Sequence, residues 1–155
     1  MMEQTGQHVV EAVSAIQGEL AKTGIAKNRK NDSQKYMFRG IDDVYAALSP
    51  RLSEHGITIT PRVVDKEFSE RQTRNGGVLY CVALTVDFHI RSKRDGSEMI
   101  ATTIGEAMDS GDKASNKAQS SAYKYMAFMT FGIPTGEDAD TETEKWPHGP
   151  HKNRT

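Results

Sequence analysis

The sequence contains one cysteine, Cys81, among its 155 residues. A single cysteine cannot form a disulfide within the chain. No apolar run approaches the ~20 residues that a membrane-spanning helix needs. The first residues, MMEQTGQHVVEA, lack the basic start and the apolar centre of a signal peptide. We therefore expect a cytoplasmic protein with no membrane partner.

Motifs of the common catalytic chemistries are also missing. The stretch GEAMDSGDK, residues 105–113, lacks the four-residue spacing and the Lys-Ser/Thr ending of an ATPase phosphate loop. Cys81 lies in a strand-like pattern, and the histidines are scattered along the chain: His8, His55, His89, His148 and His151. We therefore expect that the protein is not an enzyme and binds no metal or other cofactor. The missing phosphate loop also argues against ATP-driven exchange of DNA strands.

Charge is nearly balanced over the whole chain, with a formal net charge of −1. Any basic surface for nucleic acid must therefore be local. The final stretch EDADTETEKWPHGPHKNRT has almost no apolar residues and carries two prolines. This composition is typical of a disordered tail. We place the domain boundary near Gly136, with one domain over residues 1–136 and an acidic, then polar, tail over 137–155.

Hydrophobic spacing predicts an α+β fold. Apolar residues recur at helical spacing over residues 7–22 and again over 41–56, so both segments are expected to be helices. The second helix is expected to start with acids in its first turn and to kink or restart at Pro50. Its predicted buried residues are Ile41, Val44, Tyr45, Leu48 and Leu52.

Three strands are predicted between residues 57 and 107. The first alternates from Ile57 to Val63, and Pro61 places it at a sheet edge or a bulge. An Asn-Gly turn signal at residues 75–76 leads into an unbroken alternation over 78–91. A third strand over 98–107 places Ile100, Thr102 and Ile104 on one side. The expected architecture is a three-stranded antiparallel meander covered by a long helix and preceded by two helices.

The covering helix is predicted over residues 112–130, with Asp112 as its N-cap. A helical wheel groups the residues expected to face the sheet: Ala114, Ala118, Ala122, Tyr125, Met126 and Met129. Lys113, Lys117 and Lys124 form a separate stripe, which we call the lysine stripe and which spans ~16 Å. Such a stripe can follow the phosphates of one strand, although three solvated lysines would give the same pattern.

A second basic segment lies between the two predicted N-terminal helices. The stretch IAKNRKNDSQKYMFRG mixes Lys35 and Arg39 with Tyr36 and Phe38. Cations that neutralise phosphates and rings that stack on bases are typical of single-strand binding. An ordinary solvated loop with two aromatic residues tucked into the core remains the alternative.

Two long motifs carry a resemblance to a known family. YMFRGIDDVYAALSPRLSEHGI (36–57) and GEAMDSGDKASNKAQSSAYKYMAFMTFGIPTGEDAD (105–140) resemble the Erf family, the essential-recombination-function single-strand annealing proteins of phages and prophages. The resemblance covers nearly all of residues 7–140. That family is itself similar to the eukaryotic Rad-fifty-two annealing protein, whose core is a three-stranded sheet crossed by a helix.

This resemblance implies a function and a set of contacts. It implies ATP-independent binding of single-stranded DNA and annealing of complementary strands, by a homo-oligomer that forms a ring or arc. The lysine stripe and the first hairpin, with Arg71 and Arg74, are expected to face the DNA, with Tyr36, Phe38 and Arg39 nearby. A phage exonuclease or a host single-strand-binding protein is the expected further partner.

Two other functions fit parts of the sequence. A passive protein that coats single strands has the same composition as an annealing protein. A metal-dependent nuclease would use carboxylates as Mg²⁺ ligands. Its candidate ligands are Glu106, Asp109, Asp112, Glu137, Asp138 and Asp140. The stronger explanation is that Asp109 and Asp112 shape a turn and cap a helix, while the later acids belong to the start of the tail.

Overall fold

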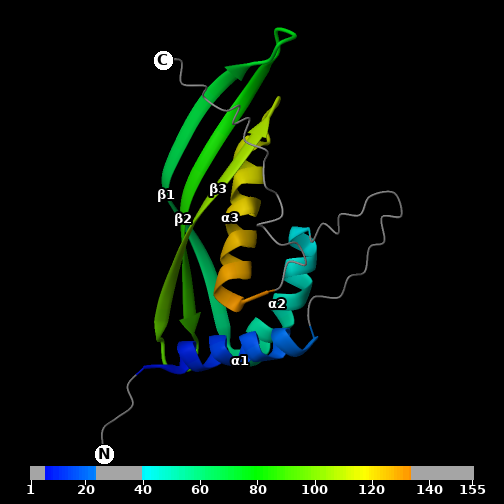
Figure 1. Cartoon of the computed structure of the whole chain (residues 1–155). Helices are drawn as coiled ribbons and strands as arrows, with labels where there is room; N and C mark the ends of the chain where they lie inside the picture. Colours follow the sequence, from blue (N-terminus) through cyan, green and yellow to red (C-terminus); the bar gives the residue numbers. More distant parts are fainter. Residues whose placement is uncertain (1–5, 24–39, 134–155) are drawn as a thin grey trace, which may run out of the picture.

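The computed structural model describes residues 6–23 and 40–133. Its elements are α1 (His8–Thr23), α2 (Ile41–His55), β1 (Ile57–Gln72), β2 (Val78–Ser92), β3 (Glu98–Asp109) and α3 (Ala114–Phe131). The strands form one antiparallel sheet in the order β1-β2-β3. Helix α3 lies along the sheet, and α1 crosses beneath the lower end of the sheet (Figure 1). This confirms the predicted α+β meander with one covering helix and two preceding helices.

The central strand β2 supplies most of the sheet's core. Its alternating residues Val82, Leu84, Val86, Phe88 and Ile90 are all buried, as the period-2 pattern predicts. On the neighbouring strands, the residues that pair with them share the face on which α3 lies. The opposite face is not covered by any of the described helices. None of these helices is long and apolar enough to cross a membrane.

Small residues let α3 approach the sheet closely. Ala114, Ala118 and Ala122 are buried against it, which confirms the alanine face expected from the sequence. A Cβ atom on Gly105 of β3 would lie 2.6 Å from the Ala122 nitrogen, and closer still to the Ala118 carbonyl oxygen. The buried Thr103 hydroxyl donates to the Ala122 carbonyl at 2.8 Å. Only glycine therefore fits at position 105.

Other details of α3 differ from the prediction. Tyr125 and Met129 are 53% and 67% exposed, because the C-terminal half of the helix buries Met126, Ala127 and Phe131 instead. Asp112 is not the N-cap: Lys113 holds that position, without a side-chain cap bond.

Helix α2 runs through Pro50 without interruption, so of the two predicted outcomes, a kink or a restart, the restart is wrong. Val44 and Leu48 are buried as expected, whereas Tyr45 is 43% exposed. Its ring stacks on Tyr123 of α3 with centroids 4.6 Å apart. Tyr45, which was predicted to be buried, thus packs against Tyr123 while part of its ring stays exposed.

Helix α1 is capped by the turn between β2 and β3. The Asp95 carboxylate accepts from the His8 backbone N–H at 3.0 Å, and the Ser97 hydroxyl accepts from that of Val9 at 2.9 Å. The His8 ring also contacts the buried Ser92 hydroxyl at 2.6 Å. Residues distant in sequence thus satisfy helix N–H groups that have no partner within the helix.

Strand β1 lies at a sheet edge, as Pro61 predicted. Its pairing with β2 shifts between Val63 and Asp65, which marks a bulge. The predicted Asn-Gly turn is present, with Gly76 at φ 80°. Both edge strands are longer than predicted, reaching Gln72 and Asp109.

Candidate nucleic-acid interface

Two residues of the lysine stripe, Lys113 and Lys117, lie at the end of α3 nearest the β1–β2 hairpin, and Lys117 contacts β3. Lys113 and Lys117 are exposed, and Lys124, two helical turns further, is partly buried. The Lys117 ammonium lies 3.1 Å from the carboxylate of Asp109, the last residue of β3. This part of the stripe therefore borders the outer edge of the sheet.

Asp109 partly neutralises these cations. The hydrogen bond from Lys117 holds the pKa of the Asp109 carboxyl below its usual range, and the charges of Lys117 and Lys113 add to this effect. Asp109 also accepts from the Gly111 backbone N–H at 3.4 Å, which agrees with its expected role in shaping the turn. A phosphate at this site must compete with the Asp109 carboxylate for Lys117.

The two arginines of the β1–β2 hairpin are exposed at the same end of the molecule. Arg71 pairs with Leu79, and Tyr80 pairs with Asp109, so Arg71 and Asp109 lie at the same level of the sheet. Their side chains point to opposite faces, since neighbouring positions of β2 alternate. The structure therefore brings Lys113, Lys117 and Arg71 to one end of the sheet, but Arg71 points to the face opposite Asp109 and its lysine partner.

The remaining predicted contacts come from the segment between α1 and α2. Lys35, Tyr36, Phe38 and Arg39 lie outside the described residues, as does the predicted tail over 137–155.

A groove between α3 and β1 was not predicted from the sequence. It consists of two depressions on the helix-covered side of the sheet. The first is bordered by Tyr45, Val63 and Tyr123, and the second by Phe68 and Tyr80. We call it the α3–β1 groove. The unbroken alternation of β2 gave no sign of it, because the groove exists only where α3 leaves β1 uncovered.

The acids proposed as nuclease ligands do not converge. Glu106 pairs with Ala83 and Asp109 with Tyr80, which places the two carboxylates on opposite faces of the sheet. Asp112 lies in the loop before α3, and Glu137, Asp138 and Asp140 lie outside the described residues. Mg²⁺ needs several oxygen ligands around one point, which the described acids of this group do not provide.

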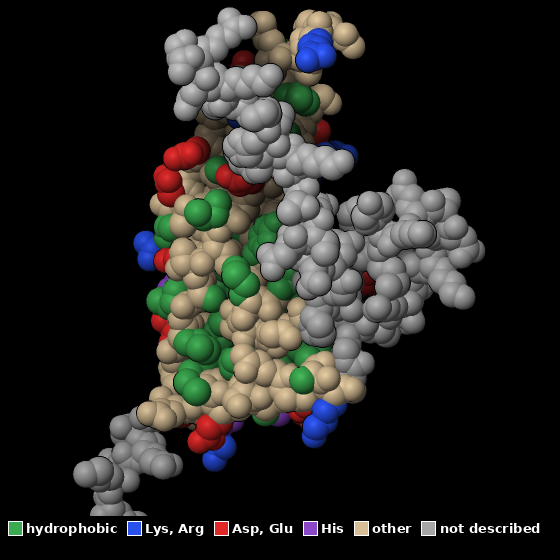
Figure 2. Space-filling view, viewed as in Figure 1, with side chains coloured by type: hydrophobic (Ala, Val, Ile, Leu, Met, Phe, Trp, Pro, Cys, Tyr) green, Lys and Arg blue, Asp and Glu red, His purple; other side chains and the backbone are tan. Residues whose placement is uncertain are grey.

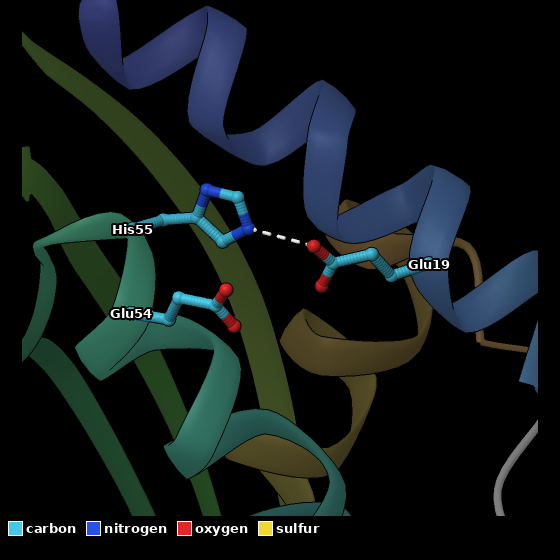
Figure 3. A group of neighbouring side chains, drawn as sticks. All are labelled: Glu19, Glu54 and His55. Atoms are coloured by element: carbon cyan, nitrogen blue, oxygen red, sulfur yellow. Dashed lines mark hydrogen bonds and ion pairs between the residues drawn. The ribbon is translucent and has the colours of Figure 1, made fainter.

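One group elsewhere in the described residues has the composition of a metal site. Glu19 of α1 faces Glu54 and His55 at the end of α2, and their ligand atoms lie within 4.8 Å of one another (Figure 3). The Glu19 carboxylate is already engaged, 2.9 Å from the His55 ring and 3.4 Å from the Arg51 guanidinium. A guanidinium on the carboxylate repels a metal cation, so this group is best explained as an ionic link between α1 and α2.

Sequence comparison matches residues 9–155 to the ERF superfamily, which is essentially the whole chain. The chain belongs to this family. Membership connects it with recombination in bacteriophages, and the proteins of the family are annealing proteins that are in general not enzymes. No curated protein gives a match.

Proposed function

We propose that this ERF-superfamily protein binds single-stranded DNA and anneals complementary strands without ATP. The observation that carries the proposal is the family match over residues 9–155. The exposed cations at the hairpin end, Lys113, Lys117, Arg71 and Arg74, support it. Cations on exposed side chains neutralise phosphates and release counterions irrespective of base sequence.

Annealing requires no covalent step. A strand must be held by its backbone while its base edges stay open, so that a second strand can test its register. Scattered exposed cations provide contacts of this kind, which are individually weak and easily displaced.

The first experiment mixes two complementary oligonucleotides with the protein in EDTA and without ATP. We expect protein-dependent annealing and no cleavage. Binding without faster annealing would favour the passive coating function instead. Cleavage that appears on adding Mg²⁺ and disappears in Asp112→Asn would overturn the proposal in favour of a nuclease.

A salt titration tests the lysine stripe. Lys117→Ala is expected to weaken binding to every DNA sequence and to reduce the slope of log K against log salt by about 0.7 per lost contact. Asp109→Asn should have the opposite effect on affinity, because it frees Lys117 from its ion pair. The matched control is Lys22→Ala, because Lys22 is an exposed residue of α1, which lies at the other end of the sheet. Unchanged binding by both Lys117→Ala and Asp109→Asn would remove the stripe from the interface.

We also propose that the protein forms a homo-oligomer. Ile100, Ile104 and Met108 lie on the uncovered face of the edge strand β3 and are 53%, 59% and 57% exposed. Figure 2 shows hydrophobic side chains gathered on the side of the molecule where β3 and α3 lie. β3 contains no proline, lysine or arginine, the residues that commonly protect an edge strand from pairing. A neighbouring subunit would cover this apolar strip, and repeated contacts of this kind would form a ring or arc.

The oligomer is tested by light scattering at micromolar concentration. Ile104→Lys is expected to dissociate the assembly, whereas Val10→Lys, at a similarly exposed position on α1, should not. A monomeric parent protein, with and without single-stranded DNA, would contradict the proposal.

A further inference from the structure

The α3–β1 groove offers aromatic surface that the fold does not bury. Two ring pairs lie along it: Tyr45 with Tyr123, and Phe68 with Tyr80, the latter with centroids 5.8 Å apart. In each pair one ring is open to solvent, since Tyr45 is 43% and Phe68 56% exposed. Tyr45 and Phe68 therefore keep ring surface that the fold leaves in contact with solvent.

The two depressions of the groove lie at different levels of strand β1. Val63, at the first depression, pairs with Val86, and Phe68, at the second, pairs with Val82. Four residues of β2 therefore separate the two positions, which is ~13 Å along the strand. At the ~3.4 Å spacing of nucleotides in a DNA strand, this distance corresponds to about four nucleotides.

Polar side chains in the groove match the chemistry of nucleobases. Asn116, Gln119 and Ser120 of α3 border the first depression, and their amide and hydroxyl groups can both donate and accept hydrogen bonds. No carboxylate borders that depression, whereas Asp112 borders the second. Lys66 of β1 and Ser115 of α3 lie on the two walls of the groove, and the Lys66 ammonium contacts the Ser115 hydroxyl at 3.2 Å. It provides a cation for a phosphate of a strand that follows the groove.

We propose that the α3–β1 groove binds unpaired nucleobases of a single strand, with bases stacked on the open faces of Tyr45 and Phe68. This inference rests on the proposed single-strand binding and adds a base-contacting site distinct from the lysine stripe. Lys117 of the stripe contacts β3, whereas the groove lies between α3 and β1. A strand in the groove is thus held through its bases as well as through its phosphates. Stacking is independent of sequence, because every base has a π-face.

The test separates base contacts from phosphate contacts. A short oligothymidylate and an abasic oligomer of the same length carry the same phosphates, but only the first carries bases. We expect the parent protein to prefer the oligothymidylate by about tenfold or more, because stacking on two rings is lost with the abasic oligomer. The variant Tyr45→Ala/Phe68→Ala should lose most of this preference and keep the parent's affinity for the abasic oligomer.

Tyr125→Ala is the matched control, because Tyr125 is a 53% exposed ring on α3 that borders neither depression. It should keep the full base preference. If the double variant also keeps that preference, the inference is wrong while the proposed function stands. If the double variant changes the oligomeric state and not the base preference, the groove is a subunit interface, which also overturns the inference. If the parent binds neither oligomer, the proposed function fails and the inference with it.

Discussion

The close contact between Gly105 and α3 predicts that Gly105→Ala is strongly destabilising. The added methyl group would lie 2.6 Å from the Ala122 nitrogen and 2.8 Å from the Ala122 Cβ. Carbon atoms pack best at ~3.5–4.0 Å, so the helix must move away by roughly 1 Å. The obstruction is helix backbone, which cannot move aside as a flexible side chain can.

The expected cost follows from the contacts that this movement disturbs. Overpacking a close-packed core costs about 1–3 kcal/mol. Weakening the buried hydrogen bond from Thr103 to the Ala122 carbonyl, 2.8 Å long, adds about 1 kcal/mol. A total of about 3 kcal/mol is a large part of the ~5–15 kcal/mol that stabilises a typical domain. With a urea slope of about 2 kcal/mol/M, the unfolding midpoint should fall by about 1.5 M.

Urea unfolding followed by circular dichroism, at one fixed protein concentration, measures this shift. Gly18→Ala is the matched control, because a Cβ at Gly18 of α1 meets no atom within 4 Å. Alanine there should raise stability by about 0.5–1 kcal/mol, through its better helix propensity. A Gly105→Ala midpoint equal to that of the parent would refute the reasoning that α3 is seated through this glycine.

Three further predictions concern the core and the pH limits of stability. Ala118 is fully buried, so Ala118→Lys should unfold or disassemble the protein, as seen by circular dichroism and light scattering. Hydrogen bonds from Ser97 and from the His8 backbone hold the pKa of Asp95 well below its usual 3.8. This contribution to stability is present above pH 3.8 and is lost as the pH falls through the lower folded pKa, so urea midpoints of Asp95→Asn should depend less on acid pH. Burial, together with Tyr45, raises the pKa of Tyr123 from 10.0 to about 12. Stability should therefore fall as the pH rises from 10.0 towards about 12, and Tyr123→Phe should reduce this loss.

Local periodicity was sufficient to predict every helix and strand of the described residues. The alternation through Val82, Leu84 and Val86 and the alanine spacing of α3 are each set by backbone geometry within one segment. Predictions that depended on a partner segment were less reliable. Tyr125 has the correct spacing for the sheet-facing side of α3, but the C-terminal half of that helix turns another side inward.

The candidate site was predictable only in part. The lysine stripe follows from helical spacing, and the structure places Lys113 and Lys117 on the surface near the hairpin. The ion pair between Lys117 and Asp109 depends on where β3 ends relative to α3, which spacing within the helix cannot show. The α3–β1 groove joins residues from α2, β1, β2 and α3, so no local pattern could have indicated it.

The sequence by itself determined the order of the elements, the antiparallel meander and the alternation of each strand, because these depend on neighbours a few residues apart. It also placed Ile100 and Ile104 together on one face of β3. Only the tertiary structure decided which face α3 covers. The helix packs on the face with Thr103 and Gly105, where small side chains permit close backbone approach, and leaves the bulkier isoleucines exposed. Close packing depends on the shapes of two surfaces, and that information is not contained in either segment alone.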